Sequence, residues 1–163
     1  MKEEYEVLHF RTHSFSAWPY NTHGCKLLYA GEYQIHEPEE TVQPPPERPN
    51  YRDAWGRAVQ VGIDNFPPPA VVDWMALDGS RHHALVDIGA IFKDERVIHR
   101  VRKGEVKPNL LDVDIMPDIF VEVNDRTIRV FMQAHVGTKH LQDPSSPLSD
   151  FRDDLIEVRS KTY

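Results

Sequence analysis

The sequence predicts a mainly β fold, an antiparallel β-sandwich of hairpins with one short helix at about residues 91–103. Two segments alternate apolar and polar residues on both sides of a turn, as expected for hairpins with one buried face. The chain also holds 13 prolines against 8 glycines. Proline disrupts helix interiors and central strands, so this composition favours short elements joined by stiff loops.

The chain length predicts one domain, residues 1–163. With 163 residues, of which 40% are hydrophobic, the chain can bury enough surface for a core of its own. The sequence has no run of 18 apolar residues, so no segment is expected to cross a membrane as a helix.

Strands with aromatic anchors are predicted in the first part of the chain. Tyr5 to Arg11 is predicted to be a strand, followed by another toward Trp18. The stretch CKLLYAGEYQIH, residues 25–36, is predicted to be a strand pair or one long bent strand, with Gly31 at a bulge or turn.

A proline-rich surface loop is expected at residues 37–50. It contains five prolines and four glutamates and has almost no apolar residues. Such a composition favours an extended polyproline conformation in solvent. The loop is either a stiff connector, which we favour, or a proline-motif ligand for a partner.

The stretch VVDWMALDGSRHHALVDIG contains two adjacent histidines, His82 and His83, which raise the question of a metal or acid–base site. A three-residue turn ending at Gly79 gives one coherent apolar face that includes Trp74 and His82, and it places Asp73 opposite His83. A two-residue turn would mix both faces. In either register the two histidines point to opposite sides of the sheet, so they cannot bind one zinc ion together.

A second hairpin is predicted in PDIFVEVNDRTIRVFMQ. A two-residue turn at Asn124-Asp125 pairs Val121 with Ile128 and collects the aliphatic residues on one face. That face contains Ile119, Val121, Val123, Ile128, Val130 and Met132. The opposite face is expected to carry Asp118, Glu122, Thr127 and Arg129.

The helix is predicted in AIFKDERVIHRVRKG. Ile91, Ile98 and Val101 fall near one helical face, basic residues occupy the last turn, and Gly104 suits a C-cap. The stretch DLIEVRSK, residues 154–161, could close the sheet as a final strand.

Motifs for catalysis or metal binding are missing from the sequence. Cys25 is the only cysteine, and the nine histidines show no H-E-x-x-H or H-x-H spacing. A G-x-S-x-G nucleophile elbow is also missing. We therefore predict no catalytic residue, no metal and no cofactor, which favours a binding protein over an enzyme.

The net charge of the chain restricts the classes of partner that we expect. The formal net charge is −7, from 26 acidic and 19 basic side chains. A polyanion would be repelled, so nucleic acid is not expected as a partner, whereas a basic protein surface is compatible. Trp18 and Tyr20, beside Pro19, form either a binding hot spot or part of the core.

Parts of the sequence resemble the bacterial domain of unknown function 2931, a family of mostly small lipoproteins. The resemblance rests on LHFRTHSFSAWP near the start, on NYRDAWGRAVQVGIDNFPPPAVVDWMALDGSRHHALVDIG, and on a strand pair late in the chain. Trp74 and the His83 region take the places of a tryptophan-bearing strand and a Tyr- or His-bearing strand. The resemblance covers about residues 7–136.

Some members of that family look like immunity proteins against lipase effectors of the type VI secretion system. The resemblance therefore implies a periplasmic protein that binds and neutralises an antibacterial phospholipase. Its alternative implication is a cell-envelope lipoprotein with a structural or small-ligand-binding role. The stretch MKEEYEVLHF has no apolar signal region and no lipid-attachment cysteine, so a periplasmic location requires a removed export signal; the alternative is the cytoplasm.

Candidate partner-binding residues come from the aromatic rim and from the acidic loop. Aromatic side chains and desolvated charges are the usual anchors of protein interfaces. The candidates are Trp18, Tyr20, Glu37, Glu39, Glu40 and Glu47.

Overall fold

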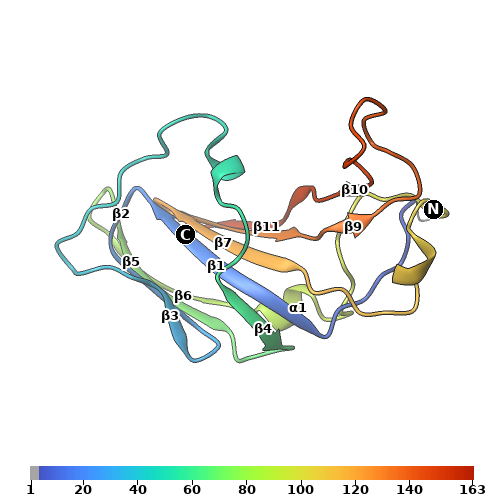
Figure 1. Cartoon of the computed structure of the whole chain (residues 1–163). Helices are drawn as coiled ribbons and strands as arrows, with labels where there is room; N and C mark the ends of the chain where they lie inside the picture. The colour runs from blue at the N-terminus through green and yellow to red at the C-terminus, as the bar shows by residue number, and fades with distance from the viewer. Residues whose placement is uncertain (1–3) are drawn as a thin grey trace.

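Two β-sheets pack face to face in the computed structural model of the chain, which describes residues 4–163 (Figure 1). The first sheet has five strands in the order β11-β8-β7-β1-β4 and the second has four in the order β3-β2-β5-β6. The strands of the first sheet are β1 (Thr12–Tyr20), β4 (Gln60–Asp64), β7 (Asp118–Asn124), β8 (Thr127–Gln133) and β11 (Leu155–Thr162). Those of the second are β2 (Thr22–Tyr29), β3 (Glu32–His36), β5 (Ala70–Ala76) and β6 (Arg81–Val86).

Short elements complete the fold. β9 (Val136–Gly137) and β10 (Phe151–Arg152) form a small two-stranded sheet. The helical turns are η1 (Tyr51–Ala54), α1 (Ile88–Ile91) and η2 (Pro108–Leu110). The predicted mainly β fold with one short α-helix is confirmed, and most strand pairs are antiparallel. The central strands β1 and β7 are parallel to each other.

The core lies between the sheets because each strand turns one apolar face inward. Phe15 on β1, Leu27 on β2 and Val121 on β7 are fully buried there. Burial of such side chains contributes about 1.5–3 kcal/mol each, so the alternating pattern is enough to fix which face points inward. The main cluster also contains Val72, Trp74, Ala84, Val86, Val123, Ile128 and Val130.

The first hairpin has the predicted register. β5 and β6 are joined by a three-residue turn that ends at Gly79, whose φ of +85° lies in the left-handed region. Asp73 pairs with His83, and His83 Nδ1 lies 2.5 Å from Asp73 Oδ1. The His82 ring stacks on the Trp74 indole, with 5.2 Å between centroids. The two histidines thus lie on opposite faces, as predicted.

The second hairpin has the predicted faces but a different register. The aliphatic side chains that we expected on one face are all buried in the core. The turn, however, is Asp125-Arg126, so Val121 pairs with Val130 rather than with Ile128. The shift of two residues keeps every side chain on its face. Asp125 takes the left-handed conformation, with φ of +53°.

The predicted helix at 91–103 is wrong. α1 ends at Ile91, and the chain then runs extended beside the N-terminal segment, with Val97 N donating to Leu8 O at 2.8 Å. Val97, His99 and Val101 are buried and alternate with exposed or half-buried neighbours. Burial of every second residue is the pattern of an extended strand, and hydrogen bonds to the distant N-terminal segment stabilise this conformation instead of a helix.

The N-terminal strands also differ from the prediction. Tyr5 and His9 make only isolated bridges, to Arg102 and Arg96, and the first long strand begins at Thr12. Residues 25–36 form the expected strand pair, with a turn at Ala30 and Gly31. The predicted final strand is confirmed as β11, which pairs with β8.

A long segment between β3 and β4 covers the outer face of the five-stranded sheet. This capping loop, residues 37–59, rises over β1 and β7 in cyan and green in Figure 1. Trp55 and Ala58 of the loop are buried against Phe120 and Phe131 of the sheet. The capping loop thus closes a second, smaller apolar cluster outside the sandwich core.

Candidate functional site

The aromatic rim and the proline-rich loop meet at one pocket. This aromatic pocket, of about 270 Å³, lies where the end of β1 faces the capping loop. Trp18 and Tyr20 contribute from β1, and the run Pro44–Pro46 contributes from the loop. The remaining lining residues are Pro19, Gln43, Glu47, Arg48, Tyr51, Ala54 and Trp55.

Backbone pairing holds the loop beside β2. Gln43 N donates to Thr22 O at 2.7 Å, and Gly24 N donates to Thr41 O at 2.9 Å. Gly24 has φ of +52°, and a Cβ atom there would lie 2.9 Å from Glu39 Cα. Only glycine lets the loop approach this closely. The proline run therefore has a fixed path and is not a free linker.

Aromatic side chains form the floor of the pocket. Trp18 and Trp55 stack at a centroid separation of 6.0 Å with planes 10° apart. Trp55 Nε1 donates to the Tyr20 hydroxyl at 2.8 Å, and Tyr51 contacts the Tyr20 ring edge-on at 5.0 Å. Burial raises the pKa of Tyr20, so its hydroxyl stays protonated at neutral pH. The floor is a rigid apolar surface with hydroxyl groups at its edge.

A buried carboxylate fixes the loop to the sheet. Glu122 on β7 is fully buried, and it accepts hydrogen bonds from Arg52 Nη2 at 3.0 Å and Arg52 Nε at 3.2 Å. The Tyr51 hydroxyl and Arg129 Nη1 also donate to it. Burial, followed by the hydrogen bond to Glu122, raises the pKa of Tyr51. The two arginines neutralise the carboxylate, as buried charges require.

The predicted glutamates do not share one surface. Glu47 lines the aromatic pocket, whereas Glu39 forms ion pairs with Lys26 at 3.7 Å and Arg81 at 3.2 Å near the four-stranded sheet. Glu37 is half-buried, and its backbone N–H donates to the carbonyl of Cys25. Glu40 is exposed. Of the predicted site residues, the structure brings together Trp18, Tyr20 and Glu47.

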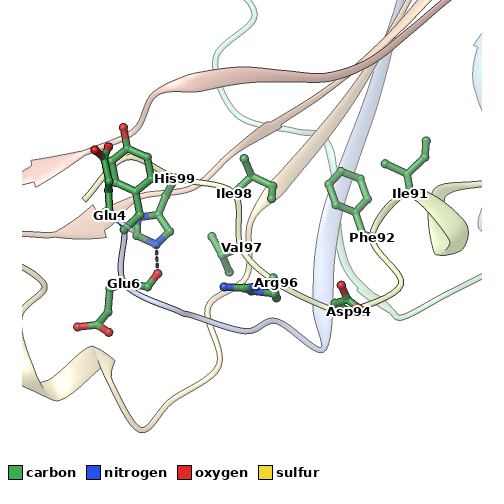
Figure 2. Close-up of a pocket in the computed structure, with 10 residues that line it drawn as sticks. Glu4, Glu6, Ile91, Phe92, Asp94, Arg96, Val97, Ile98 and His99 are labelled. Carbon is green, nitrogen blue, oxygen red and sulfur yellow. Dashed lines mark hydrogen bonds between the residues drawn. The ribbon is translucent and has the colours of Figure 1, made fainter. Parts of the chain in front are cut away.

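A second pocket, of about 390 Å³, lies between the N-terminal segment and residues 91–99 (Figure 2). Its walls are mainly apolar, with Phe92 and Ile98 among them. His99 Nε2 donates to Glu6 O at 2.6 Å and its Nδ1 accepts from Val101 N, so the imidazole is neutral. Burial lowers the pKa of His99. Its ring nitrogens are committed to backbone groups and are not available for acid–base chemistry.

A serine–histidine contact at the β5–β6 turn has the wrong polarity for nucleophilic catalysis. The Ser80 hydroxyl donates to Asp78 Oδ1 at 2.5 Å, so the contact of 2.7 Å with His82 requires the imidazole to donate. An activated serine must donate its proton to the histidine instead. Hydrogen bonds from Ser80 lower the pKa of Asp78, which keeps this carboxylate an acceptor.

Metal binding finds no support in the described part of the chain. Residues 4–163 contain no cluster of three histidine, cysteine or carboxylate side chains that could hold an ion. Cys25 is buried, and burial raises its pKa to about 12. Within the same residues, none of the helices has the length and apolar character needed to cross a membrane.

Comparisons with known protein-family models, curated proteins and solved structures found no match to this chain. The resemblance to the domain of unknown function 2931 therefore remains an expectation from the sequence. Sequence reasoning placed Glu122 on the face opposite the core and did not identify it as a functional residue. It also missed Tyr51 and Arg52, which donate hydrogen bonds to Glu122. The one available signal was a strand glutamate flanked by Val121 and Val123, an apolar setting that is unusual for a solvent-facing carboxylate.

Proposed function

We propose that this chain is a non-enzymatic binding protein whose docking surface is the aromatic pocket. The observation that supports it is the meeting of Trp18 and Tyr20 with the Pro44–Pro46 run on one rigid surface. Rigid aromatic and proline surfaces bind partners with little loss of conformational entropy. The net charge of −7 of the whole chain favours a partner with basic residues around an apolar anchor.

The partner that we propose is a secreted antibacterial lipase of the type VI secretion system, which the chain would bind and neutralise in the periplasm. This assignment rests on the sequence resemblance. A test is to read the genes beside this chain's gene for a lipase, to express that lipase with and without the chain, and to measure cell survival and complex formation. Survival together with a stable complex is expected. The proposed partner is wrong if the lipase neither binds the chain nor loses toxicity.

The docking surface has its own test in a pair of exposed prolines. Pro45 lines the aromatic pocket and Pro49 lies in the same loop outside it. We expect Pro45→Glu to weaken lipase binding at least about tenfold by placing a charge at an apolar contact, and Pro49→Glu to leave it unchanged. Equal affinities for the two variants in calorimetry would place the interface elsewhere on the molecule.

A second candidate function, binding of a small apolar ligand by an envelope protein, is favoured by the pocket in Figure 2. Its volume of about 390 Å³ is at the lower end of ligand sites, and its walls are mainly apolar. A fluorescent fatty acid is a suitable probe. Saturable binding of the probe would support this function if Ile98→Glu abolishes it. Leu148→Glu, a substitution at an exposed site elsewhere, should preserve the binding.

A further inference from the structure

A third pocket lies beside the free edge of β11. β11 is the outermost strand of the five-stranded sheet, and among residues 4–163 it has β8 on one side and no strand on the other. β6 is an edge strand of the four-stranded sheet, and residues of both edge strands line the pocket, which has a volume of about 170 Å³. This edge pocket shares no residue with the aromatic pocket, and its role is independent of the function proposed above. Its lining includes Val86 of β6, Ile128 and Val130 of β8, and Arg159 and Lys161 of β11.

Backbone groups of β11 point toward the free side of the strand. Tyr163 N donates to Arg126 O at 2.8 Å, and the register with β8 continues without a shift over residues 159–162. Hydrogen bonding alternates along an antiparallel strand, so the N–H and C=O groups of Ser160 and Thr162 point away from β8. A strand edge with such groups is a template for a further strand.

The floor of the edge pocket is aliphatic. Val86, Ile128 and Val130 belong to the sandwich core and are at most 7% exposed. The volume of the pocket is well below the roughly 300–1,000 Å³ of small-molecule sites, so it suits one aliphatic side chain rather than a free ligand. A strand added to β11 would direct every second side chain toward this space.

Arg159 and Lys161 give the edge pocket a positive charge. Both side chains are exposed, and neither forms an ion pair with a carboxylate of residues 4–163. Asp87 is the one acidic side chain among the lining residues, and its Oδ1 already accepts from Ala90 N at 3.0 Å at the start of α1. Acidic side chains of an added strand would therefore find unpaired cations directly opposite them.

The same two cations oppose pairing of β11 with a second copy of itself. In a symmetrical antiparallel pair centred on Arg159 or Lys161, that residue lies opposite its own copy. A pair centred on Ser160 places Arg159 opposite Lys161. Like charges directly opposite each other are destabilising, and lysines on edge strands commonly block self-association. The edge thus fits an acidic segment of another protein better than a second copy of this chain.

We infer that the edge of β11 binds an extended acidic segment of a partner protein as an additional strand. The main chain of the segment bonds to Ser160 and Thr162, and one aliphatic side chain enters the edge pocket. Carboxylates two residues before and after that side chain lie on the same face of the segment and contact Arg159 and Lys161. Such a segment alternates acidic and aliphatic residues at every second position.

Three synthetic peptides test this inference with the isotope-labelled chain. The acidic peptide is Ac-Thr-Glu-Thr-Leu-Thr-Glu-Thr-NH2. The lysine peptide has lysine in place of both glutamates, and the methylated peptide is the acidic peptide with N-methyl groups on its two central threonines. We expect the acidic peptide to cause saturable NMR shifts and slower hydrogen exchange at the Ser160 and Thr162 amides. The other two peptides should bind at least about tenfold more weakly.

Each control peptide isolates one part of the inference. The net charge of −7 alone would favour the lysine peptide, so a preference for the acidic peptide reports a local contact. N-methylation removes the donors that face β11 and keeps the side chains. Equal binding of the methylated peptide, equal binding of the lysine peptide, or shifts confined to other strands would overturn the inference.

Charge reversal in the chain gives a second test. Lys161→Glu should weaken binding of the acidic peptide at least about tenfold. Lys139→Glu makes the same change of net charge at an exposed lysine outside the edge pocket and should leave the binding unchanged. Replacing both Arg159 and Lys161 by glutamate should reverse the preference, so that the lysine peptide binds more tightly, which a folding defect cannot produce. Equal losses in the two single variants, or no reversal in the double variant, contradict the inference.

Discussion

At the scale of single residues, Glu122 connects the capping loop to the sheet. Its carboxylate is fully buried, and the side chains of its partners Arg52 and Arg129 are about one third exposed. Removing one member of a buried ion pair leaves the others with an uncompensated charge. The loop is therefore held by a specific polar contact as well as by the Trp55 cluster.

We expect Glu122→Gln to lower the free energy of unfolding by about 2–4 kcal/mol, because Arg52 then loses its counter-charge and Arg129 keeps only the exposed Glu157. Urea denaturation measures the change. Glu157→Gln is the matched control, since Glu157 is an exposed partner of the same Arg129 and should cost less than about 1 kcal/mol. Equal effects of the two substitutions would show that the buried ion pair contributes no more to the free energy of unfolding than the exposed one.

Cys25 offers a second test at this scale. Burial, followed by the nearby carboxylates Glu37 and Asp73, raises its pKa to about 12. Since the thiolate is the reactive form, the native chain at pH 8 should react with iodoacetamide roughly 10³-fold more slowly than the denatured chain. Mass spectrometry follows the alkylation. Native and denatured rates within tenfold of each other would mean that the thiol is accessible in the fold.

At the scale of elements, prediction from sequence succeeded where the information was local. The turn at Gly79 and the alternation around it were enough to fix the β5–β6 register. The segment after α1 was mispredicted for two reasons. The alternation of buried residues at Val97, His99 and Val101 is hard to recognise among the basic residues between them, and the hydrogen-bond partners of the segment lie near the N-terminus. Strand pairing over such distances leaves little trace in a local window.

The same limit applies to the candidate site. Trp18 and Tyr20 were identifiable as an aromatic rim, but nothing local shows that the proline run packs beside them. The burial of Glu122 could not be predicted because its partner Arg52 lies 70 residues earlier in the chain. The sequence can identify candidate site residues, but their burial depends on packing against a loop that is distant in the chain.

The capping loop depends on Gly24 for its close approach to β2. We expect Gly24→Ala to lower the free energy of unfolding by at least about 1 kcal/mol more than Gly31→Ala does. Both glycines have positive φ, but a Cβ atom at Gly31 meets nothing within 4 Å, whereas one at Gly24 meets Glu39. Urea denaturation compares the stabilities, and hydrogen exchange at the Gln43 amide reports the loop contact. Equal losses would mean that the loop can move away freely.

At the scale of the whole molecule, buried histidines make folding sensitive to pH. His13 is fully buried, with Nδ1 donating to Asn65 Oδ1 at 2.6 Å and Nε2 accepting from the Tyr29 hydroxyl at 2.9 Å. Burial lowers the pKa of His13, although the hydrogen bond to Asn65 opposes the shift. Burial also lowers the pKa of His99. Both rings are therefore neutral in the folded chain.

Stability should decrease as the pH falls from 7.5 to 5.5. The unfolded chain takes up protons near the ordinary histidine pKa of 6.5, while the folded chain resists protonation until lower pH. The stabilising contribution is fully present above 6.5 and is lost below it. Urea denaturation across this range checks the slope, which should be shallower in His13→Gln. A flat profile for the parent chain would contradict the expectation.

The contact between the capping loop and β7 also has an evolutionary consequence. Tyr51, Arg52 and Arg129 are useful at their positions only while residue 122 is an acid, and the acid is tolerated only while they neutralise it. Drift at one position therefore selects for change at the others. Among related chains, the residues at these four positions should change together. Most chains should have polar residues at all four positions or apolar residues at all four, and few should combine the two.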